Sequence, residues 1–266
     1  TLNNLNYVFK HNYHKVMINF IIWKFKKIHY KIFNKPTSKD TLQYRDYLHR
    51  ELVEIYGVEY FQNKRILEIG PRDGEDSFRI EEFNPSEYVL IDLPDKEEIN
   101  LKWLGNLKPN HKFIQTNFLY MTQKDYESLG KFDLIYFTGV LYHNPEQLRF
   151  IQKLYDKLNY GGVLVLESAT TRKRKFINEN VVEIHYPTTY RDTTTVSHLP
   201  SKKAIISWLQ MAGFKEIHNS KCYEKENYNI KDIRFACIAR KNEKDKPDSY
   251  YSKQLKEQSF IIGKST

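Results

Sequence analysis

Short apolar runs alternate with helical patterns along most of the chain between residues 64 and 168. The apolar runs have the length of strands and lie at 65–69, 87–92, 112–115, 132–138 and 162–167. Amphipathic segments typical of helices fall near 75–83, 95–104, 122–129 and 145–158. Strands and helices that alternate at this spacing form βαβ units, whose parallel sheet is covered on both faces. The pattern predicts an α/β fold with a doubly wound, mostly parallel sheet.

The segments that flank this alternation follow other patterns. Residues 38–57 read as a helix that Ser38 or Asp40 can cap and that Gly57 ends. Residues 169–199 form a long connection rich in Thr, Arg and Lys, and a connection of that length usually carries function. Pro200 is expected to open a helix that runs to about Ala212.

Two β-type runs follow that helix, near 214–223 and 233–240. The chain then becomes mostly polar over 241–266, which is typical of a tail or a loosely docked extension. We therefore expect an N-terminal basic helical arm over 1–57, one domain over 58–240 with an acceptor-side insertion at 169–199, and a polar C-terminal tail.

The net charge of +9 is concentrated in the arm. Residues 1–39 hold eight lysines and no Asp, Glu or Arg, so the rest of the chain carries only +1. A polyanion such as nucleic acid needs a broad basic surface, so the nearly neutral body makes a nucleic-acid partner the weaker alternative. The apolar stretch at 16–23 is shorter than the roughly 20 residues that span a bilayer. We expect the arm to pack on the body, to cover the substrate, or to make peripheral membrane contact or self-associate through residues 10–35.

Only two cysteines are present, Cys222 and Cys237. This number excludes a disulfide-dense secreted scaffold and a multi-cysteine zinc site, and it favours a reducing, cytoplasmic setting. The two thiols, 15 residues apart on predicted neighbouring strands, read as core residues. Since no cluster has the spacing of metal ligands, we expect no metal site.

A glycine-bracketed turn follows the first predicted strand, in the run Glu68-Ile69-Gly70-Pro71-Arg72-Asp73-Gly74. Gly70 and Gly74 allow a sharp strand-to-helix turn where a ligand approaches the backbone closely. Glu68 can accept hydrogen bonds from a cationic amine but would repel a pyrophosphate. The alternative is an ordinary turn between a strand and a helix.

Polar residues also end the next two strands. Asp92 follows the second strand at the position from which a carboxylate reaches ribose hydroxyls in doubly wound nucleoside sites. Asn117 and Phe118 follow the third strand, where they could contact an adenine, or could instead be a turn-forming Asn and a core Phe. Together with Glu68, these residues indicate a nucleoside whose other end carries an amine.

The motifs resemble those of the class I S-adenosylmethionine-dependent methyltransferases over about 64–240. The resemblance rests on the glycine turn, Asp92, Asn117, and the phrase from Phe132-Asp133-Leu134 through Gly161-Gly162-Val163-Leu164-Val165-Leu166-Glu167. It implies a Rossmann-like seven-stranded sheet whose last two strands form a hairpin with one antiparallel member. It also implies S-adenosyl-L-methionine as the cofactor. Many family members have a glycine where Arg72 stands, so the contact there is expected to differ.

The resemblance assigns a role to each part of the predicted cofactor site. Glu68 and Gly70 would lie near the methionine part, Asp92 at the ribose, Asn117 at the adenine, and the backbone around Thr138 at the methionine amine. Tyr142 would form a wall against the cofactor. The full set of expected cofactor-binding residues is Glu68, Gly70, Arg72, Gly74, Asp92, Leu93, Asn117, Phe118, Thr138 and Tyr142.

Other phrases are similar to the family that contains the tRNA wobble-uridine carboxymethyltransferase. They are Gly139-Val140-Leu141-Tyr142-His143, Leu166-Glu167-Ser168, and Leu199-Pro200-Ser201 followed by Trp208-Leu209 and Gly213-Phe214. Sugar and lipid-pathway methyltransferases use such phrases as well. That tRNA enzyme has a longer region before the glycine motif than the 64 residues here. The basic run Arg172-Lys173-Arg174-Lys175 is either a solvated loop or a phosphate clamp.

A hydroxyl acceptor must lose a proton as the new bond forms, and histidine suits that task near neutral pH. His143 and His185 are the candidate catalytic bases, while Tyr190, Arg191 and His198 are candidate substrate residues. A structural or solvated role is the alternative for each histidine. The leading hypothesis is O-methylation of a sugar, a glycan precursor or another small molecule. A tRNA-modifying methyltransferase and a non-catalytic cofactor-binding or membrane-associated scaffold are the alternatives.

Overall fold

The computed structural model describes residues 38–94, 98–171, 173–176, 178–187, 195–224 and 234–243. The chain divides into a unit over Thr1–Gln43 and a larger one over Tyr44–Thr266, and the larger unit holds the fold described below. Most of the predicted basic arm and the whole predicted polar tail beyond residue 243 lie outside the described residues.

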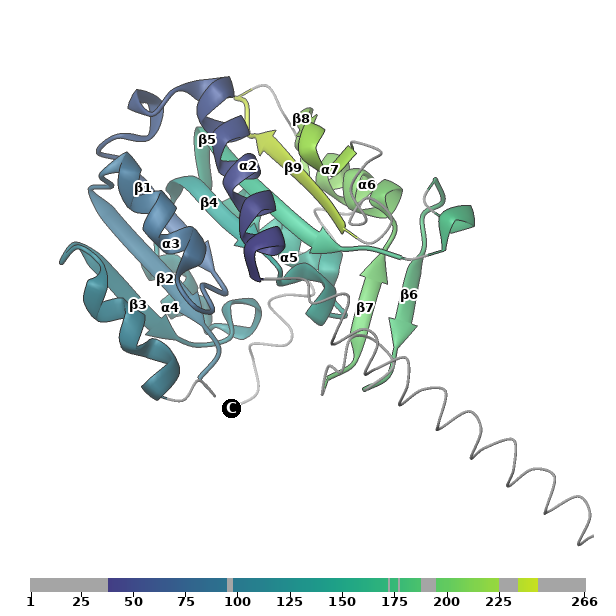
Figure 1. Ribbon diagram of the computed structural model, residues 1–266, viewed down its shortest axis with the longest axis horizontal. Helices are drawn as coiled ribbons and strands as arrows, with labels where there is room; N and C mark the ends of the chain where they lie inside the picture. Colours follow the sequence, from purple (N-terminus) through teal and green to yellow (C-terminus); the bar gives the residue numbers. More distant parts are fainter. Residues whose placement is uncertain are drawn as a thin grey trace, which may run out of the picture. The chain divides into compact units, whose positions relative to one another are not determined.

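The larger unit is built on a seven-stranded sheet with the strand order β3-β2-β1-β4-β5-β9-β8 (Figure 1). Strands β1 to β5 are parallel, while β9 runs antiparallel to both of its neighbours, β5 and β8. The predicted doubly wound sheet with a C-terminal hairpin is therefore confirmed. The strands are β1 (Arg65–Ile69), β2 (Glu87–Asp92), β3 (His111–Gln115), β4 (Phe132–Thr138), β5 (Leu158–Ala169), β8 (Glu216–Asn219) and β9 (Arg234–Arg240).

Helices cover both faces of the sheet, which explains why its strands are nearly continuous apolar runs. One face packs against α2 (Ser38–Tyr56), α3 (Glu75–Ile80) and α7 (Lys221–Glu224). The other packs against α4 (Gln123–Ser128), α5 (Gln147–Lys157) and α6 (Lys202–Ala212). Figure 1 shows α2 and α3 in front of the sheet. Alternate residues of each strand enter the two cores, so Ile66 faces α2 and Leu67 faces α5.

Short 3-10 turns connect several of these elements. They are η1 (Glu59–Phe61), η2 (Glu81–Phe83), η3 (Glu98–Asn106), η4 (Phe118–Tyr120), η5 (Leu141–His143) and η6 (Arg174–Phe176). The segment predicted as a helix near 95–104 is a 3-10 helix over 98–106, and residues 95–97 lie outside the described part. The other predicted helices match within a few residues.

The connection predicted over 169–199 contains a second, two-stranded sheet. Strand β6 (Val182–His185) pairs antiparallel with β7 (Ser197–Pro200) to form a hairpin beside the main sheet (Figure 1). Pro200 therefore ends a strand instead of opening a helix, at a place where its missing N–H is tolerated. Helix α6 begins at Lys202, and Ser201 caps it by accepting a hydrogen bond from the Ala204 amide at 3.0 Å.

The two cysteines are buried and free, as predicted for core thiols. However, Cys222 lies on α7 and not on a strand, because pairing with β9 stops at Asn219. Within the described residues, no helix combines the length and the apolar character needed to cross a membrane.

Candidate functional site

The glycine turn between β1 and α3 is closely surrounded by other side chains. Gly70 has φ +74° and Gly74 has φ +81°, in the left-handed region that favours glycine. A Cβ on Gly70 would lie 2.4 Å from Val140 Cγ2, and one on Gly74 would lie 2.4 Å from the Trp103 ring. Both glycines are therefore required by conformation and by space.

Arg72, inside the same turn, also adopts a left-handed conformation, with φ +54°. Its side chain is 75% exposed, and its nearest carboxylate contact is Asp73, at 3.9 Å. The backbone of Arg72 thus has the conformation that suits the glycine found here in many resembling proteins. The arginine side chain lies on the surface of the turn, where the structure gives it no fixed role.

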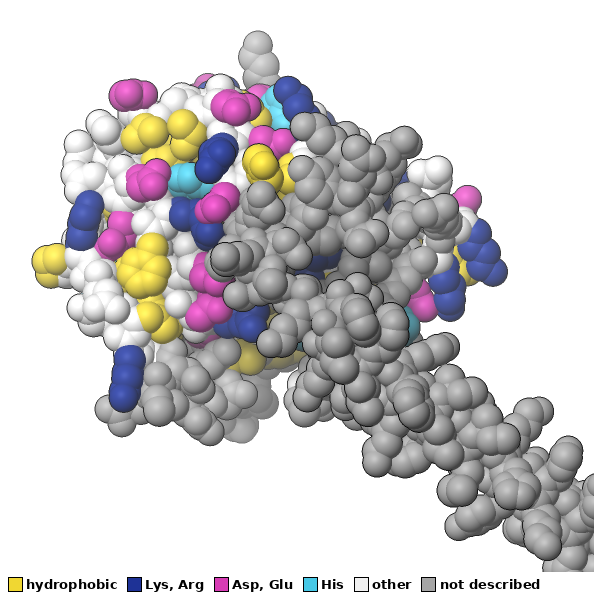
Figure 2. Space-filling model, in the orientation of Figure 1, with side chains coloured by type: hydrophobic (Ala, Val, Ile, Leu, Met, Phe, Trp, Pro, Cys, Tyr) yellow, Lys and Arg dark blue, Asp and Glu magenta, His cyan; other side chains and the backbone are white. Residues whose placement is uncertain are grey.

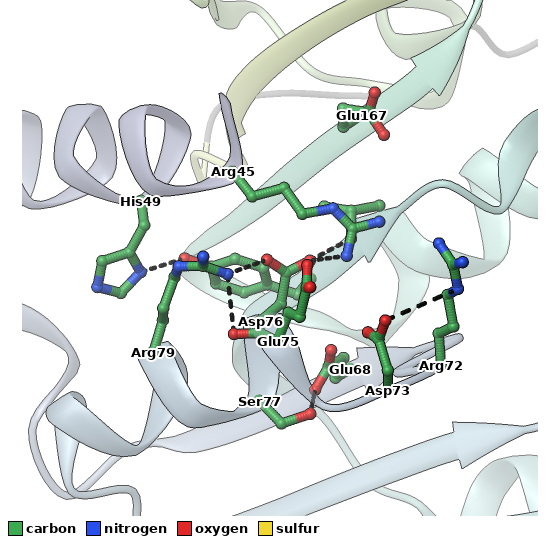
Figure 3. A network of polar contacts seen from close by, with 12 residues as sticks. Arg45, His49, Glu68, Arg72, Asp73, Glu75, Asp76, Ser77, Arg79 and Glu167 are labelled. Carbon is green, nitrogen blue, oxygen red and sulfur yellow. Dashed lines mark hydrogen bonds and ion pairs between the residues drawn. The ribbon is translucent and has the colours of Figure 1, made fainter. Parts of the chain in front are cut away.

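A buried carboxylate, Asp76 in the first turn of α3, joins three elements at this edge of the sheet (Figure 3). Its Oδ2 accepts a hydrogen bond of 2.6 Å from the Thr138 hydroxyl at the end of β4. Arg45 Nη1, from α2, lies 3.1 Å from the same oxygen, and Arg79 donates to Oδ1 at 3.2 Å. The backbone around Thr138 was predicted to lie at a cofactor amine, and that stays a prediction; the Thr138 side chain binds Asp76.

Glu68 lies under α3, almost completely buried. Its Oε2 accepts hydrogen bonds from the Ser77 hydroxyl, at 2.6 Å, and from the Tyr88 hydroxyl. Burial, followed by the nearby Asp76 carboxylate, raises the pKa of Glu68 to about 8. These contacts fix the Glu68 side chain, which supports the glycine turn between β1 and α3.

Two guanidinium groups converge on Gly139, the residue that follows β4. A Cβ built on Gly139, whose φ is +74°, would lie 3.3 Å from Arg45 Nη2 and 4.0 Å from Arg234 Nη2. Arg234 donates two hydrogen bonds to the buried Glu167, from Nη2 to Oε2 at 2.6 Å and from Nε to Oε1. Burial lowers the pKa of Arg45, but the carboxylates of Asp76 and Glu167 outweigh it and raise this pKa above its ordinary value.

The predicted nucleoside-binding residues lie along the same edge, at the ends of β2 and β3. Asp92 is buried, and its Oδ1 accepts a hydrogen bond of 2.8 Å from the amide of Leu93, which is exposed. Asn117 caps η4 by accepting a hydrogen bond from the Leu119 amide at 3.1 Å. Phe118 is only 2% exposed and stacks on Phe150 with centroids 5.5 Å apart, so its ring belongs to the core. The structure therefore favours the alternative of a turn-forming Asn and a core Phe for this pair of side chains.

The turn η5 and the hairpin meet beside this edge. Tyr142 packs against the buried Leu199 of β7 and Ala169 of β5. The Gln147 amide donates to two backbone carbonyls, of Leu141 at 3.1 Å and of His198 at 2.7 Å, and so ties η5 to β7. His143 is exposed, and its ring lies 4.1 Å from that of Tyr142.

The hairpin register places the other two candidate histidines on opposite faces. Ile184 pairs with His198, and His185 pairs with Ser197, so His185 shares a face with Ser197 and His198 does not. The face with His185 also carries Glu183 and Leu199, and Leu199 packs against Tyr142. We call it the inner face. Burial lowers the pKa of His198.

His185 has a carboxylate beside it on the inner face. Its Nε2 lies 3.0 Å from Glu183 Oε1. Glu183 is held in turn by the Thr171 hydroxyl at 2.7 Å and by Lys173 Nζ at 3.0 Å. Burial raises the pKa of Glu183, but these contacts outweigh it and leave the pKa below its ordinary value. Tyr190 and Arg191, the other candidate substrate residues, lie outside the described residues.

Four site residues were not predicted from the sequence, namely Arg45, Asp76, Glu167 and Arg234. Asp76 follows Gly74 by two residues in the first turn of a predicted helix, which was a usable signal. Glu167 ends a predicted strand. Arg45 and Arg234 are brought in from α2 and β9 by tertiary packing, and nothing local marks them. Among the residues that the structure describes, no three His, Cys, Asp or Glu side chains are grouped so that they could hold a metal ion.

A family model described as a methyltransferase domain matches residues 41–219. The tRNA U34 carboxymethyltransferase of Nautilia profundicola is 28% identical over 166 residues, which are 59% of this chain and 49% of that protein. The Campylobacter jejuni protein of the same name is 28% identical over 162 residues, 58% of this chain and 50% of its own length. The chain thus spans about half the length of the curated relatives it matches.

Solved structures share the fold at low sequence identity. The N-terminal domain of EvdMO1, in the presence of SAH and D-fucose, has a TM-score of 0.55 at 16% identity and covers 73% of this chain and 81% of that one. A putative S-adenosylmethionine-dependent methyltransferase from Listeria monocytogenes has a TM-score of 0.55 at 13% identity, with coverages of 75% and 98%. The N-methyltransferase NodS from Bradyrhizobium japonicum, in complex with S-adenosyl-L-homocysteine, gives 0.52 at 15% identity, with coverages of 80% and 92%.

Proposed function

The chain belongs to the methyltransferase-domain family whose model it matches, and on that premise we propose that it transfers a methyl group from S-adenosyl-L-methionine to a hydroxyl of a sugar, a glycan precursor or another small molecule. The observation that carries the cofactor part is the donor set at one sheet edge. Asp92 offers a carboxylate suited to ribose hydroxyls, and Arg45 holds a guanidinium beside the Gly139 backbone, suited to the carboxylate of an amino acid.

The cofactor, when bound, supplies an activated methyl group for an in-line displacement. Asp92 would hold the ribose, and Arg45 together with the Thr138–Gly139 backbone the amino-acid end. Asp76 fixes Arg45 by its ion pair, and Glu68 supports the turn that the cofactor approaches. The chain's own task is then to align the acceptor and to remove its proton.

The inner face of the hairpin suits a hydroxyl acceptor. The Ser197 hydroxyl is buried there and has no hydrogen-bond partner among the described residues, so an acceptor hydroxyl would satisfy it. His185 lies opposite Ser197 in the register, with Glu183 behind its Nε2. A carboxylate in that position orients an imidazole and stabilises its protonated form. We therefore prefer His185 to His143 as the general base.

Binding of S-adenosylhomocysteine, measured by calorimetry, tests the cofactor part. Asp92→Asn and Arg45→Lys should each weaken binding roughly tenfold while the thermal melt stays close to that of the wild type. Lys102→Gln, an exposed lysine on η3, is the matched control. A folded wild-type protein that does not bind the compound would contradict the proposal.

Turnover with labelled S-adenosylmethionine tests the chemistry. We expect His185→Asn to lower kcat by about a hundredfold with little change in cofactor affinity, and His143→Asn to have a smaller effect. Activity that is lost in Asp92→Asn would exclude a non-catalytic cofactor-binding role. If His143→Asn is the more damaging change, the assignment of the base is reversed.

A tRNA-modifying activity is the second candidate, because tRNA U34 carboxymethyltransferases match 58–59% of the chain. Such an enzyme must bind a polyanion, and its affinity must fall steeply with salt. Filter binding of total tRNA over a salt titration separates the two candidates. Specific binding with a strong salt dependence would favour tRNA, whereas its absence would leave the small-molecule acceptor.

A further inference from the structure

The strand β6 has its polar and apolar faces reversed. Val182 and Ile184 point to the outer face and are 41% and 59% exposed, while Glu183 and His185 point to the inner face. Tyr186, directly after the strand, is 71% exposed. In a sheet with one solvated face the apolar residues ordinarily point inward and the polar ones outward. The reversal leaves apolar side chains largely exposed on the outer face of the hairpin.

Exposed hydrophobic side chains are also concentrated in this part of the chain. Eight large hydrophobic side chains are exposed in the described part of the chain, and three of them fall within these five residues. Single exposed apolar side chains are ordinary, but a contiguous row marks a contact surface. We call Val182, Ile184 and Tyr186 the outer row.

The segment of chain that contains the hairpin is rich in positive charge. Residues 172–203 contain seven Lys or Arg and only three Asp or Glu, although residues 40–266 as a whole carry just +1. Lys175 in η6 is exposed, and its Nζ lies 4.7 Å from the centre of the Phe176 ring. Lys173, which precedes η6, is exposed as well but pairs with Glu183 of the inner face at 3.0 Å. Figure 2 shows Lys and Arg side chains beside a hydrophobic one at the right-hand edge of the molecule, at the place of η6 in Figure 1.

We propose that the outer row and Lys175 of η6 dock the protein onto an anionic lipid surface. Aliphatic side chains partition among acyl chains, a tyrosine suits the interface, and lysines bind anionic headgroups. An RNA partner would use aromatic stacking and phosphate contacts, for which Val182 and Ile184 have no use. A second copy across a two-fold axis would bring two basic segments together, which disfavours self-association at this face.

Docking onto an anionic lipid surface also indicates the chemical class of the acceptor. The inner face, which carries His185 and Ser197, is the opposite face of the same hairpin, so docking of the outer row would hold the proposed site near the lipid surface and favour an acceptor with an anionic headgroup. This second step rests on the proposed function, whereas the docking itself does not.

Co-sedimentation of the full chain with vesicles tests the docking. Vesicles of phosphatidylcholine with phosphatidylglycerol are compared with vesicles of phosphatidylcholine alone. We expect the variant I184S/Y186S to lose roughly tenfold or more in partitioning onto the anionic vesicles. Lys175→Glu should weaken the same binding at low salt more than at high salt.

The matched control is I55S/Y160S, which removes an exposed isoleucine and an exposed tyrosine from α2 and β5. Because the lysines of residues 1–39 are present in every variant, their contribution cancels in the comparison. Equal vesicle binding by I184S/Y186S and the control would overturn the docking proposal, as would a loss of tRNA binding without a loss of vesicle binding. Calorimetry with S-adenosylhomocysteine on the same samples reports separately on the proposed function.

Discussion

The Thr138 hydroxyl donates a hydrogen bond of 2.6 Å to Asp76 Oδ2 and so joins the end of β4 to the first turn of α3. Asp76 also binds Arg45 and Arg79, so one buried carboxylate holds two arginines and a threonine. Thr138 pairs in register with Glu167, which binds Arg234. The ends of β4 and β5 and the helices α2 and α3 are thus joined by polar contacts at the edge where the cofactor is proposed to bind.

Replacing Asp76 with Asn should destabilise the protein and weaken cofactor binding together. An amide keeps the contact with Thr138, but it leaves the largely buried Arg45 without its ion-pair partner and Arg79 with only Asp46, which costs about 3 kcal/mol. Urea unfolding gives the free energy, and calorimetry gives the affinity for S-adenosylhomocysteine. Asp46→Asn, which removes a more exposed partner of Arg79, should change stability by less than about 1 kcal/mol. Equal losses in the two variants would show that Asp76 has no special role.

Glu68 should make the stability of the protein depend on pH. Its pKa is about 8 in the folded state, against an ordinary value of 4.5, so the folded state binds a proton that the unfolded state has released. Stability should therefore fall as pH rises from about 4.5 to about 8, by at most about 1.4 kcal/mol per pH unit. Glu68→Gln should remove that slope in urea unfolding followed across the range. Glu82→Gln, an exposed control on η2, should retain it.

Arg72→Gly should leave the fold intact and raise its stability. A left-handed backbone destabilises a non-glycine residue by about 1–2 kcal/mol, and glycine removes this strain. Glycine also loses more conformational entropy on folding, which offsets about 0.5–1 kcal/mol of the gain. We expect a net gain of up to about 1 kcal/mol in thermal or urea unfolding. Arg72→Ala keeps the strained backbone and should give no such gain. A destabilised Arg72→Gly would mean that the exposed side chain makes a contact that matters.

Gly70→Ala should be strongly destabilising. It forces a Cβ into a left-handed conformation and against Val140 Cγ2, and these two effects together cost roughly 2–4 kcal/mol. A second change, Val140→Ala, should recover the packing part but not the backbone part. Gly105→Ala, where nothing lies within 4 Å of the new Cβ, is the control and should be nearly neutral. If Gly70→Ala and Gly105→Ala unfold at the same urea concentration, the turn tolerates more movement than its contacts indicate.

Most of the secondary structure followed from local patterns. Strands β1, β2 and β4 have the predicted bounds, because both of their faces are buried and the apolar run is as long as the strand. The hairpin β6–β7 was missed because its strands are only four residues long and its alternation is reversed, with Val182 and Ile184 outward. Pro200 was misassigned because a proline next to a helix start also fits the end of an edge strand.

The candidate site, too, was predicted in part from the sequence and decided in part by tertiary packing. Gly70, Gly74, Asp92 and Asn117 were predicted to lie at one sheet edge, because parallel strands bring their carboxyl ends together whatever the details of packing. Phe118 was open between a ligand contact and the core, and only its stacking on Phe150 decided for the core.

The sequence alone determined the βα alternation, the edge on which the polar residues gather, and the location of the excess charge. These features depend on periods of two and 3.6 residues and on simple counting, which are local properties. The tertiary structure decided which distant groups meet there. Arg45 reaches Asp76 from α2, Arg234 reaches Glu167 from β9, and the hairpin register separates His185 from His198. Such contacts depend on how whole elements pack and pair, so no local pattern in the chain could predict them.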